Sequence, residues 1–78
     1  MTVDGQETME RLTTTMRMHR ARMDLTQAEL AERAGITRKS INAIEAGQMV
    51  PSTILALKLA RALGLTVEDL FALELDID

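Results

Sequence analysis

Apolar residues recur through most of the chain at spacings of three and four, which is the period of an amphipathic helix. Short polar stretches interrupt this pattern and divide it into five segments. The pattern therefore predicts an all-α domain over residues 8–72, with helices at about 8–23, 27–34, 38–46, 53–63 and 67–72. Residues 1–7 are acidic and polar without periodicity, and we expect them to be a flexible terminus.

Residues typical of helix ends support these boundaries. Thr26 and Glu29 have the spacing of a capping box, in which each side chain accepts a hydrogen bond from the backbone N–H of the other residue. Thr66 and Asp69 have the same spacing before the fifth helix. Gly35 is expected to end the second helix, because glycine tolerates the left-handed conformation that commonly follows a helix.

The pattern changes near the C-terminus, where apolar and acidic residues alternate. The apolar members are Phe71, Leu73, Leu75 and Ile77. A period of two predicts a strand with one apolar face, for which an all-helical domain offers no partner. Residues 73–78 are then either a loosely packed tail over the fifth helix or a strand that pairs with its copy in a second subunit. We prefer the dimerisation strand, because an unpaired strand edge is a template for another chain.

The second and third predicted helices are short and are joined by a tight turn that contains glycine. This is the arrangement of a helix-turn-helix. Ala31 and Ala34 are small enough to let the two helices approach closely, and Gly35 permits the sharp turn. Ile36 and Ile41 are then expected to hold the third helix at a steep angle on the second.

The stretch from Leu25 to Gly47, LTQAELAERAGITRKSINAIEAG, resembles the helix-turn-helix motif of the Cro and phage-repressor family. Residues 51–52, 60–65 and 67–71 are also similar to parts of that family's last two helices. The resemblance covers residues 16–71, which is most of the chain. It implies a five-helix, lambda-repressor-like domain that binds double-stranded DNA.

The resemblance also implies roles for individual residues. Those implied to contact DNA are Gln27, Thr37, Arg38, Lys39, Ser40, Asn42, Ala43 and Gln48. Gln27 corresponds to a glutamine that braces the DNA backbone, and Thr37 begins the helix that contacts base edges. Arg20 and Glu45 correspond to a pair that forms a buried salt bridge between the first and third helices.

The chemistry of these side chains agrees with the implied roles. Arginine and lysine bind guanine O6 and N7, and asparagine binds adenine. Taken alone, Arg38 and Lys39 would be interpreted as solvated charges at the start of a helix. Within the whole motif, contact with DNA is the better interpretation. The loop Gln48–Pro51 lacks the Lys or Arg that many members of that family carry there. Either the affinity for the DNA backbone is modest, or Gln48 and main-chain amides contact phosphate.

The distribution of charge supports a polyanionic partner, although the net charge is −3. All nine Lys and Arg residues lie between Arg11 and Arg61, and only four acidic residues share that stretch, which gives it a net charge of +5. The other eight acidic residues lie in the two terminal segments. A basic middle between acidic ends favours nucleic acid binding.

Composition also excludes several classes of site. The chain has no cysteine and one histidine, so we expect neither disulfides nor a metal centre, and no cofactor is indicated. We find no apolar run that could cross a membrane, no nucleophile–base set, and no second domain for a small-molecule ligand. The sequence thus predicts a cytoplasmic protein that is not an enzyme.

The interpretation that accounts for most of these features is a transcriptional regulator, expected to be a repressor, that reads the major groove of duplex DNA with residues 37–46. We expect a homodimer that binds half-sites about 34 Å apart. The alternative is a helix-turn-helix protein-interaction module, such as an antitoxin or adaptor, without its own operator. The acidic termini and the uncharged loop after Gly47 favour this alternative to some degree.

Overall fold

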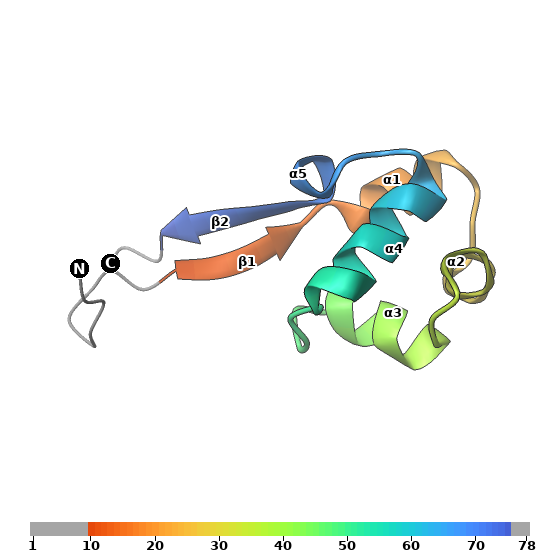
Figure 1. The fold of residues 1–78 in the computed structure, drawn as a ribbon, viewed down its shortest axis with the longest axis horizontal. Coiled ribbons are helices and arrows are strands. Elements are labelled where there is room, and N and C mark those ends of the chain that lie inside the picture. Colours follow the sequence, from red (N-terminus) through yellow and green to blue (C-terminus); the bar gives the residue numbers. More distant parts are fainter. Residues whose placement is uncertain (1–9, 76–78) are drawn as a thin grey trace.

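The computed structural model describes residues 10–75, which form five helices and a two-stranded sheet (Figure 1). The elements are β1 (Glu10–Thr14), α1 (Met16–Arg22), α2 (Gln27–Ala34), α3 (Arg38–Glu45), α4 (Thr53–Leu63), α5 (Val67–Leu70) and β2 (Phe71–Leu75). The predicted acidic terminus at 1–7 and the predicted dimer contact Ile77 lie outside the described residues. Within the described residues, no helix combines the length and apolar character that crossing a bilayer requires.

The N-terminal part of the predicted first helix is a strand, so the predicted all-α domain is confirmed only in part: its five helices are present, but the first of them is shorter and follows a strand. The helix begins at Met16, and Glu10–Thr14 pairs with β2 in an antiparallel ladder. The hydroxyl of Thr14 accepts a hydrogen bond from the backbone N–H of Met16 at the point where strand changes to helix. Leu12 and Met16 fit a helical period, which is why a single helix was predicted. Residues 10–14 form a strand because β2, a distant part of the chain, pairs with them.

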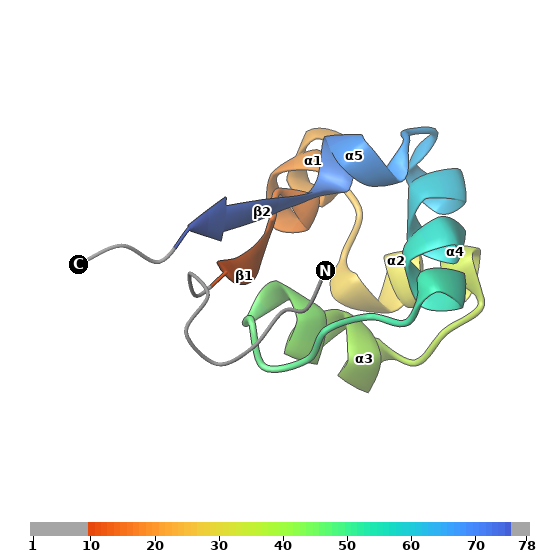
Figure 2. The same cartoon turned by 60° about the vertical axis from the view of Figure 1, so that its left-hand side comes forward.

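The predicted C-terminal strand is present, but it has a partner within its own chain. Leu73 lies opposite Leu12, and Glu74 lies opposite Arg11. The fifth helix consequently ends at Leu70 instead of continuing to residue 72. We call the pair of strands β1 and β2 the ribbon. The ribbon extends from one side of the helical body (Figures 1 and 2).

The other predicted boundaries agree with the structure to within one residue. Both capping boxes are present, with the Thr26 backbone N–H 2.8 Å from a carboxylate oxygen of Glu29. Gly35 ends α2 with φ of +75°, a conformation that would strain a residue with a side chain. These signals act over three or four residues, so the sequence alone was sufficient to locate them.

Residues from all five helices form the core. Those with fully buried side chains are Met16, Leu30, Ile41, Ile44, Leu59 and Leu70. In Figure 2, α1 and α5 lie at the top of the helical body and α3 lies at the bottom. Because α3 contributes Ile41 and Ile44 to the core, its opposite face is turned toward solvent.

Candidate nucleic-acid interface

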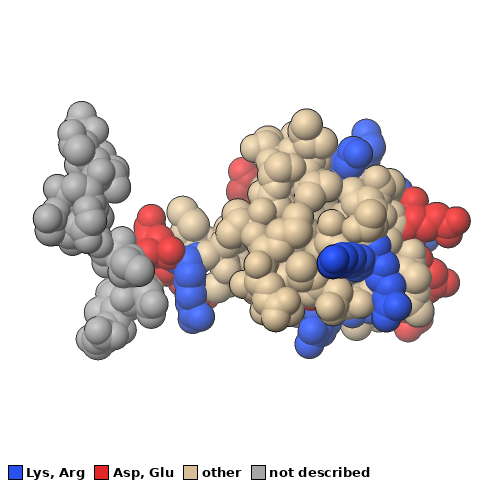
Figure 3. Space-filling view, turned by 90° about the horizontal axis from the view of Figure 1, so that it is seen from below, with Lys and Arg blue, Asp and Glu red and all other residues tan. Residues whose placement is uncertain are grey.

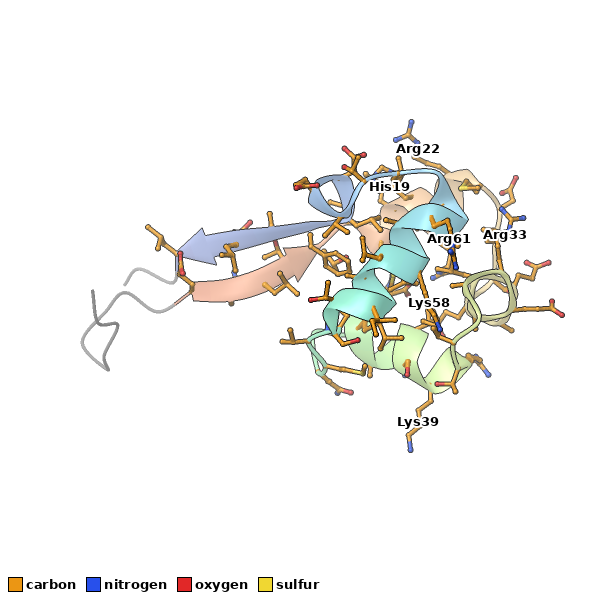
Figure 4. All side chains as sticks on the ribbon, in the orientation of Figure 1. His19, Arg22, Arg33, Lys39, Lys58 and Arg61 are labelled. Atoms are coloured by element: carbon orange, nitrogen blue, oxygen red, sulfur yellow. The ribbon has the colours of Figure 1, made fainter. Side chains whose placement is uncertain are left out.

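The solvent-facing side of α3 presents polar and basic side chains. Arg38, Lys39 and Asn42 are exposed, and together with Gln27 of α2 they line a shallow surface hollow. Lys39 points away from the body on the α3 side (Figure 4). On that side, Lys and Arg gather on the helical body among uncharged residues, and the acidic groups lie toward its rim and on the ribbon (Figure 3). Neither Arg38 nor Lys39 has an ion-pair partner among residues 10–75.

The first turn of α3 is held by its own hydroxyl groups. Thr37 Oγ1 accepts a hydrogen bond from the backbone N–H of Ser40 at 3.1 Å and donates one to Ser40 Oγ at 3.0 Å. Thr37 is exposed, whereas Ser40 and Ala43 are half-buried. The cap therefore orients the helix start, and Arg38, Lys39 and Asn42 are the residues of α3 that extend outward.

A buried carboxylate anchors the other end of α3. The Glu45 side chain is fully buried, and Arg20 of α1 donates to it through Nε at 2.7 Å and Nη2 at 3.1 Å. Arg20 also donates through Nη1 to the carbonyl oxygen of Leu25 at 2.8 Å. Arg17 adds a longer ion pair of 3.5 Å. These contacts fix α3 relative to α1 and to the chain entering α2.

Gln27 links this buried network to the exposed face of α3. Its Nε2 donates to Glu45 Oε1 at 3.0 Å and to Asn42 Oδ1 at 3.3 Å. Glu45 is an acceptor, so the NH₂ group of Gln27 must face it, and both hydrogens of that group are engaged. The Gln27 side chain therefore orients Asn42, whose own NH₂ group remains available as a donor.

The ionisation of Glu45 reflects two opposing effects. Burial by itself raises the pKa of this carboxyl, because burial disfavours the charged form. Hydrogen bonds from Arg20 and Gln27, with the positive charge of Arg20, outweigh burial and hold the pKa of Glu45 below its ordinary value. Glu45 is thus a buried anion that its neighbours keep charged.

The lowered pKa of Glu45 predicts a loss of stability in acid. A folded-state pKa below the unfolded value of about 4.3 means that the unfolded chain binds the proton more tightly. The contribution of Glu45 is therefore fully present above that value and is lost as the pH falls through the folded-state pKa. We expect the free energy of unfolding, measured in urea by circular dichroism, to fall steadily below about pH 5.

Two other carboxyl groups contribute in the same direction. Backbone and side-chain hydrogen bonds of the capping boxes lower the pKa of Glu29 and of Asp69. The double variant Glu29→Gln, Asp69→Asn removes these two titrating carboxyl groups and keeps that of Glu45, so it isolates the contribution of Glu45. The acid-induced loss should persist in this variant, and a free energy of unfolding that became independent of pH would contradict the role of Glu45.

Several contacts were not anticipated from the sequence. Arg17 lies one turn before Arg20 on α1, so the i, i+3 spacing of the two arginines was a signal that could have identified it. The link from Gln27 to Asn42 depends on how two helices cross, and no local pattern indicates it. Gln48 is exposed, but its backbone N–H donates to the Ala43 carbonyl oxygen at 2.9 Å, so this N–H is already engaged within the chain.

Comparison with known proteins identifies the family. A helix-turn-helix family profile matches residues 16–70. An uncharacterised HTH-type transcriptional regulator of Methanothermobacter thermautotrophicus is 53% identical over 64 residues, which are 81% of this chain and 93% of that protein. The uncharacterised HTH-type transcriptional regulator YgzD of Bacillus subtilis is 47% identical over 55 residues, 70% of this chain and 83% of YgzD.

A solved structure supports the same assignment. The restriction-modification controller protein C.AhdI from Aeromonas hydrophila superposes with a TM-score of 0.67 at 33% identity, covering 69% of this chain and 82% of C.AhdI. The profile, the relatives and the fold all include the segment that contains α2 and α3. The chain therefore belongs to the helix-turn-helix family of the Cro and phage-repressor type, whose members are DNA-binding transcriptional regulators and not enzymes.

Proposed function

We propose that the protein is a sequence-specific repressor that binds duplex DNA as a homodimer and places α3 of each subunit in the major groove. The observation that carries this proposal is the outward face of α3, where Arg38, Lys39 and Asn42 project from a helix anchored by buried Glu45. An interface that reads bases needs side chains held in a defined position, and the Glu45 network provides this. Such a regulator acts where the DNA is, which is the cytoplasm in a cell without a nucleus.

The proposed contacts follow from the groups that each residue presents. Arg38 and Lys39 donate to guanine or phosphate, and Asn42 pairs with adenine while its Oδ1 accepts a hydrogen bond from Gln27. Ala43 offers its methyl group to a thymine methyl. The residues proposed to touch the DNA backbone are Thr37, Ser40 and Gln48. Gln27 reaches phosphate only if it releases the longer of its two hydrogen bonds, the one to Asn42.

Salt dependence tests the proposal. The purified chain is titrated into random-sequence duplex DNA at two salt concentrations, and binding is followed by fluorescence anisotropy. We expect the logarithm of the affinity to fall linearly with the logarithm of the salt concentration, with a slope of about 0.9 per phosphate neutralised. An operator is then selected from a random library, and the spacing of its half-sites should be near 34 Å, about one helical turn.

The competing function is a protein-interaction module without an operator. Val50, in the uncharged loop after α3, has 75% of its surface exposed, which favours a protein partner at that loop. Such a module would not bind random duplex even at low salt. That outcome would remove the DNA-binding proposal and favour the adaptor.

A further inference from the structure

The two faces of the ribbon differ sharply in chemistry. Leu12 and Glu10 of β1 share one face with three apolar residues of β2, which are Phe71, Leu73 and Leu75. The other face carries the ion pair between Arg11 and Glu74. Leu73 is 65% exposed and Leu75 is 53% exposed, so the outer part of this apolar face is not covered by any of residues 10–75.

This apolar face continues onto the helical body. Leu12 and Phe71 line a groove together with Val50 and Leu57. Leu57 also lies beside Ile54, with Lys58 and Arg61 next to them on α4. Of the seven large hydrophobic residues that are exposed between residues 10 and 75, five belong to this continuous surface. These five are Val50, Ile54, Leu57, Leu73 and Leu75.

A surface of this kind indicates an interaction site. An isolated two-stranded ribbon is at best marginally stable in water, because one face of it stays exposed. Soluble monomers rarely present large contiguous apolar patches, and such patches mark interaction sites. Opposite charges lie at the two ends of this surface. Glu10 is at the outer end of the ribbon, and Lys58 and Arg61 are on α4, at the end of the surface that lies on the helical body.

We propose that this surface is the interface with a second copy of the chain, in which the apolar face of each ribbon packs on the Val50–Leu57 groove of its partner. The inference rests on the proposed function and specifies the surface that forms the dimer. A two-fold contact brings each patch against its own copy in the opposite direction. Glu10 of one subunit then lies near Lys58 and Arg61 of the other, which brings opposite charges together.

The arrangement leaves the DNA-facing side free. The ribbon leaves the body sideways, whereas Lys39 points away from the body on the α3 side (Figure 4). A two-fold axis parallel to the direction in which Lys39 points directs both α3 helices to the same side of the dimer, and we include that direction in the proposal. This face-to-face contact differs from pairing of β2 edges, in which the apolar face would remain exposed.

Two substitutions on neighbouring residues of β2 test which face forms the contact. Leu73→Glu places a charge on the apolar face, and Ala72→Glu places the same charge on the opposite face. Sedimentation velocity should give the mass of a dimer for the unaltered chain and for Ala72→Glu, and the mass of a monomer for Leu73→Glu. A monomeric unaltered chain, or equal behaviour of the two variants, would overturn the proposal.

A charge exchange tests the direction of packing. Glu10→Lys and Arg61→Glu should each raise the dimer dissociation constant at least about tenfold, because each puts like charges opposite one another. The chain that carries both should recover at least part of the lost affinity, and no recovery would overturn this arrangement. The Leu73→Glu monomer should still bind random duplex at low salt, and loss of that binding would count against the proposed function instead.

Discussion

Replacing Glu45 with alanine is expected to lower the free energy of unfolding by about 3–5 kcal/mol. The carboxylate is fully buried and receives two hydrogen bonds from Arg20 and one from Gln27. Its removal leaves the guanidinium of Arg20 without its counterion in a largely buried position. A domain of this size has a total stability of about 4–12 kcal/mol, so urea unfolding followed by circular dichroism will detect the change readily.

An exposed ion pair of the same chain provides the control. Arg11 and Glu74 are 3.6 Å apart, and their side chains are 67% and 55% exposed. Glu74→Ala should therefore cost no more than about 1 kcal/mol, because water solvates both charges when the pair is broken. Arg20→Met combined with Glu45→Leu should be more stable than Glu45→Ala, since no buried charge is left alone. Equal losses for Glu45→Ala and Glu74→Ala would contradict the buried anchor.

Replacing both Arg38 and Lys39 with alanine is expected to abolish specific DNA binding while the fold is retained. A good side-chain contact to a base edge contributes about 1–3 kcal/mol, so the pair accounts for a loss of operator affinity of about 30-fold or more. Both side chains are exposed, and neither forms an ion pair within residues 10–75. Anisotropy titrations against the selected operator measure the loss, and thermal unfolding verifies the fold.

The matched control removes the same number of charges elsewhere. Arg22 of α1 and Arg33 of α2 lie away from Lys39 (Figure 4). A chain with both replaced by alanine has the same net charge as the first variant, and it should keep most of its operator affinity. If the two double variants lost operator affinity equally, non-specific electrostatic attraction to DNA would explain binding. In that case α3 would not be the helix that contacts the bases.

The helix-turn-helix segment was predictable because its signals are local. The capping box of Thr26 and Glu29 and the left-handed Gly35 operate within a single turn, so the bounds of α2 followed from the residues themselves. The apolar spacing of Ile41 and Ile44 indicated which face of α3 is buried. The same spacing leaves Arg38 and Lys39 on the outward face, whereas their assignment to DNA contact came from the resemblance to the Cro and phage-repressor family.

The ribbon and the polar network around Glu45 depended on the tertiary structure. Residues 10–14 are compatible with either a helix or a strand, and they form a strand because β2 returns beside them from the other end of the chain. The contact of Gln27 with both Asn42 and Glu45 likewise exists only where α2 and α3 cross. Sequence patterns within one turn determined the helices that carry the proposed DNA contacts, whereas pairing between distant segments decided the ribbon, because strand hydrogen bonds need a partner that local periodicity does not specify.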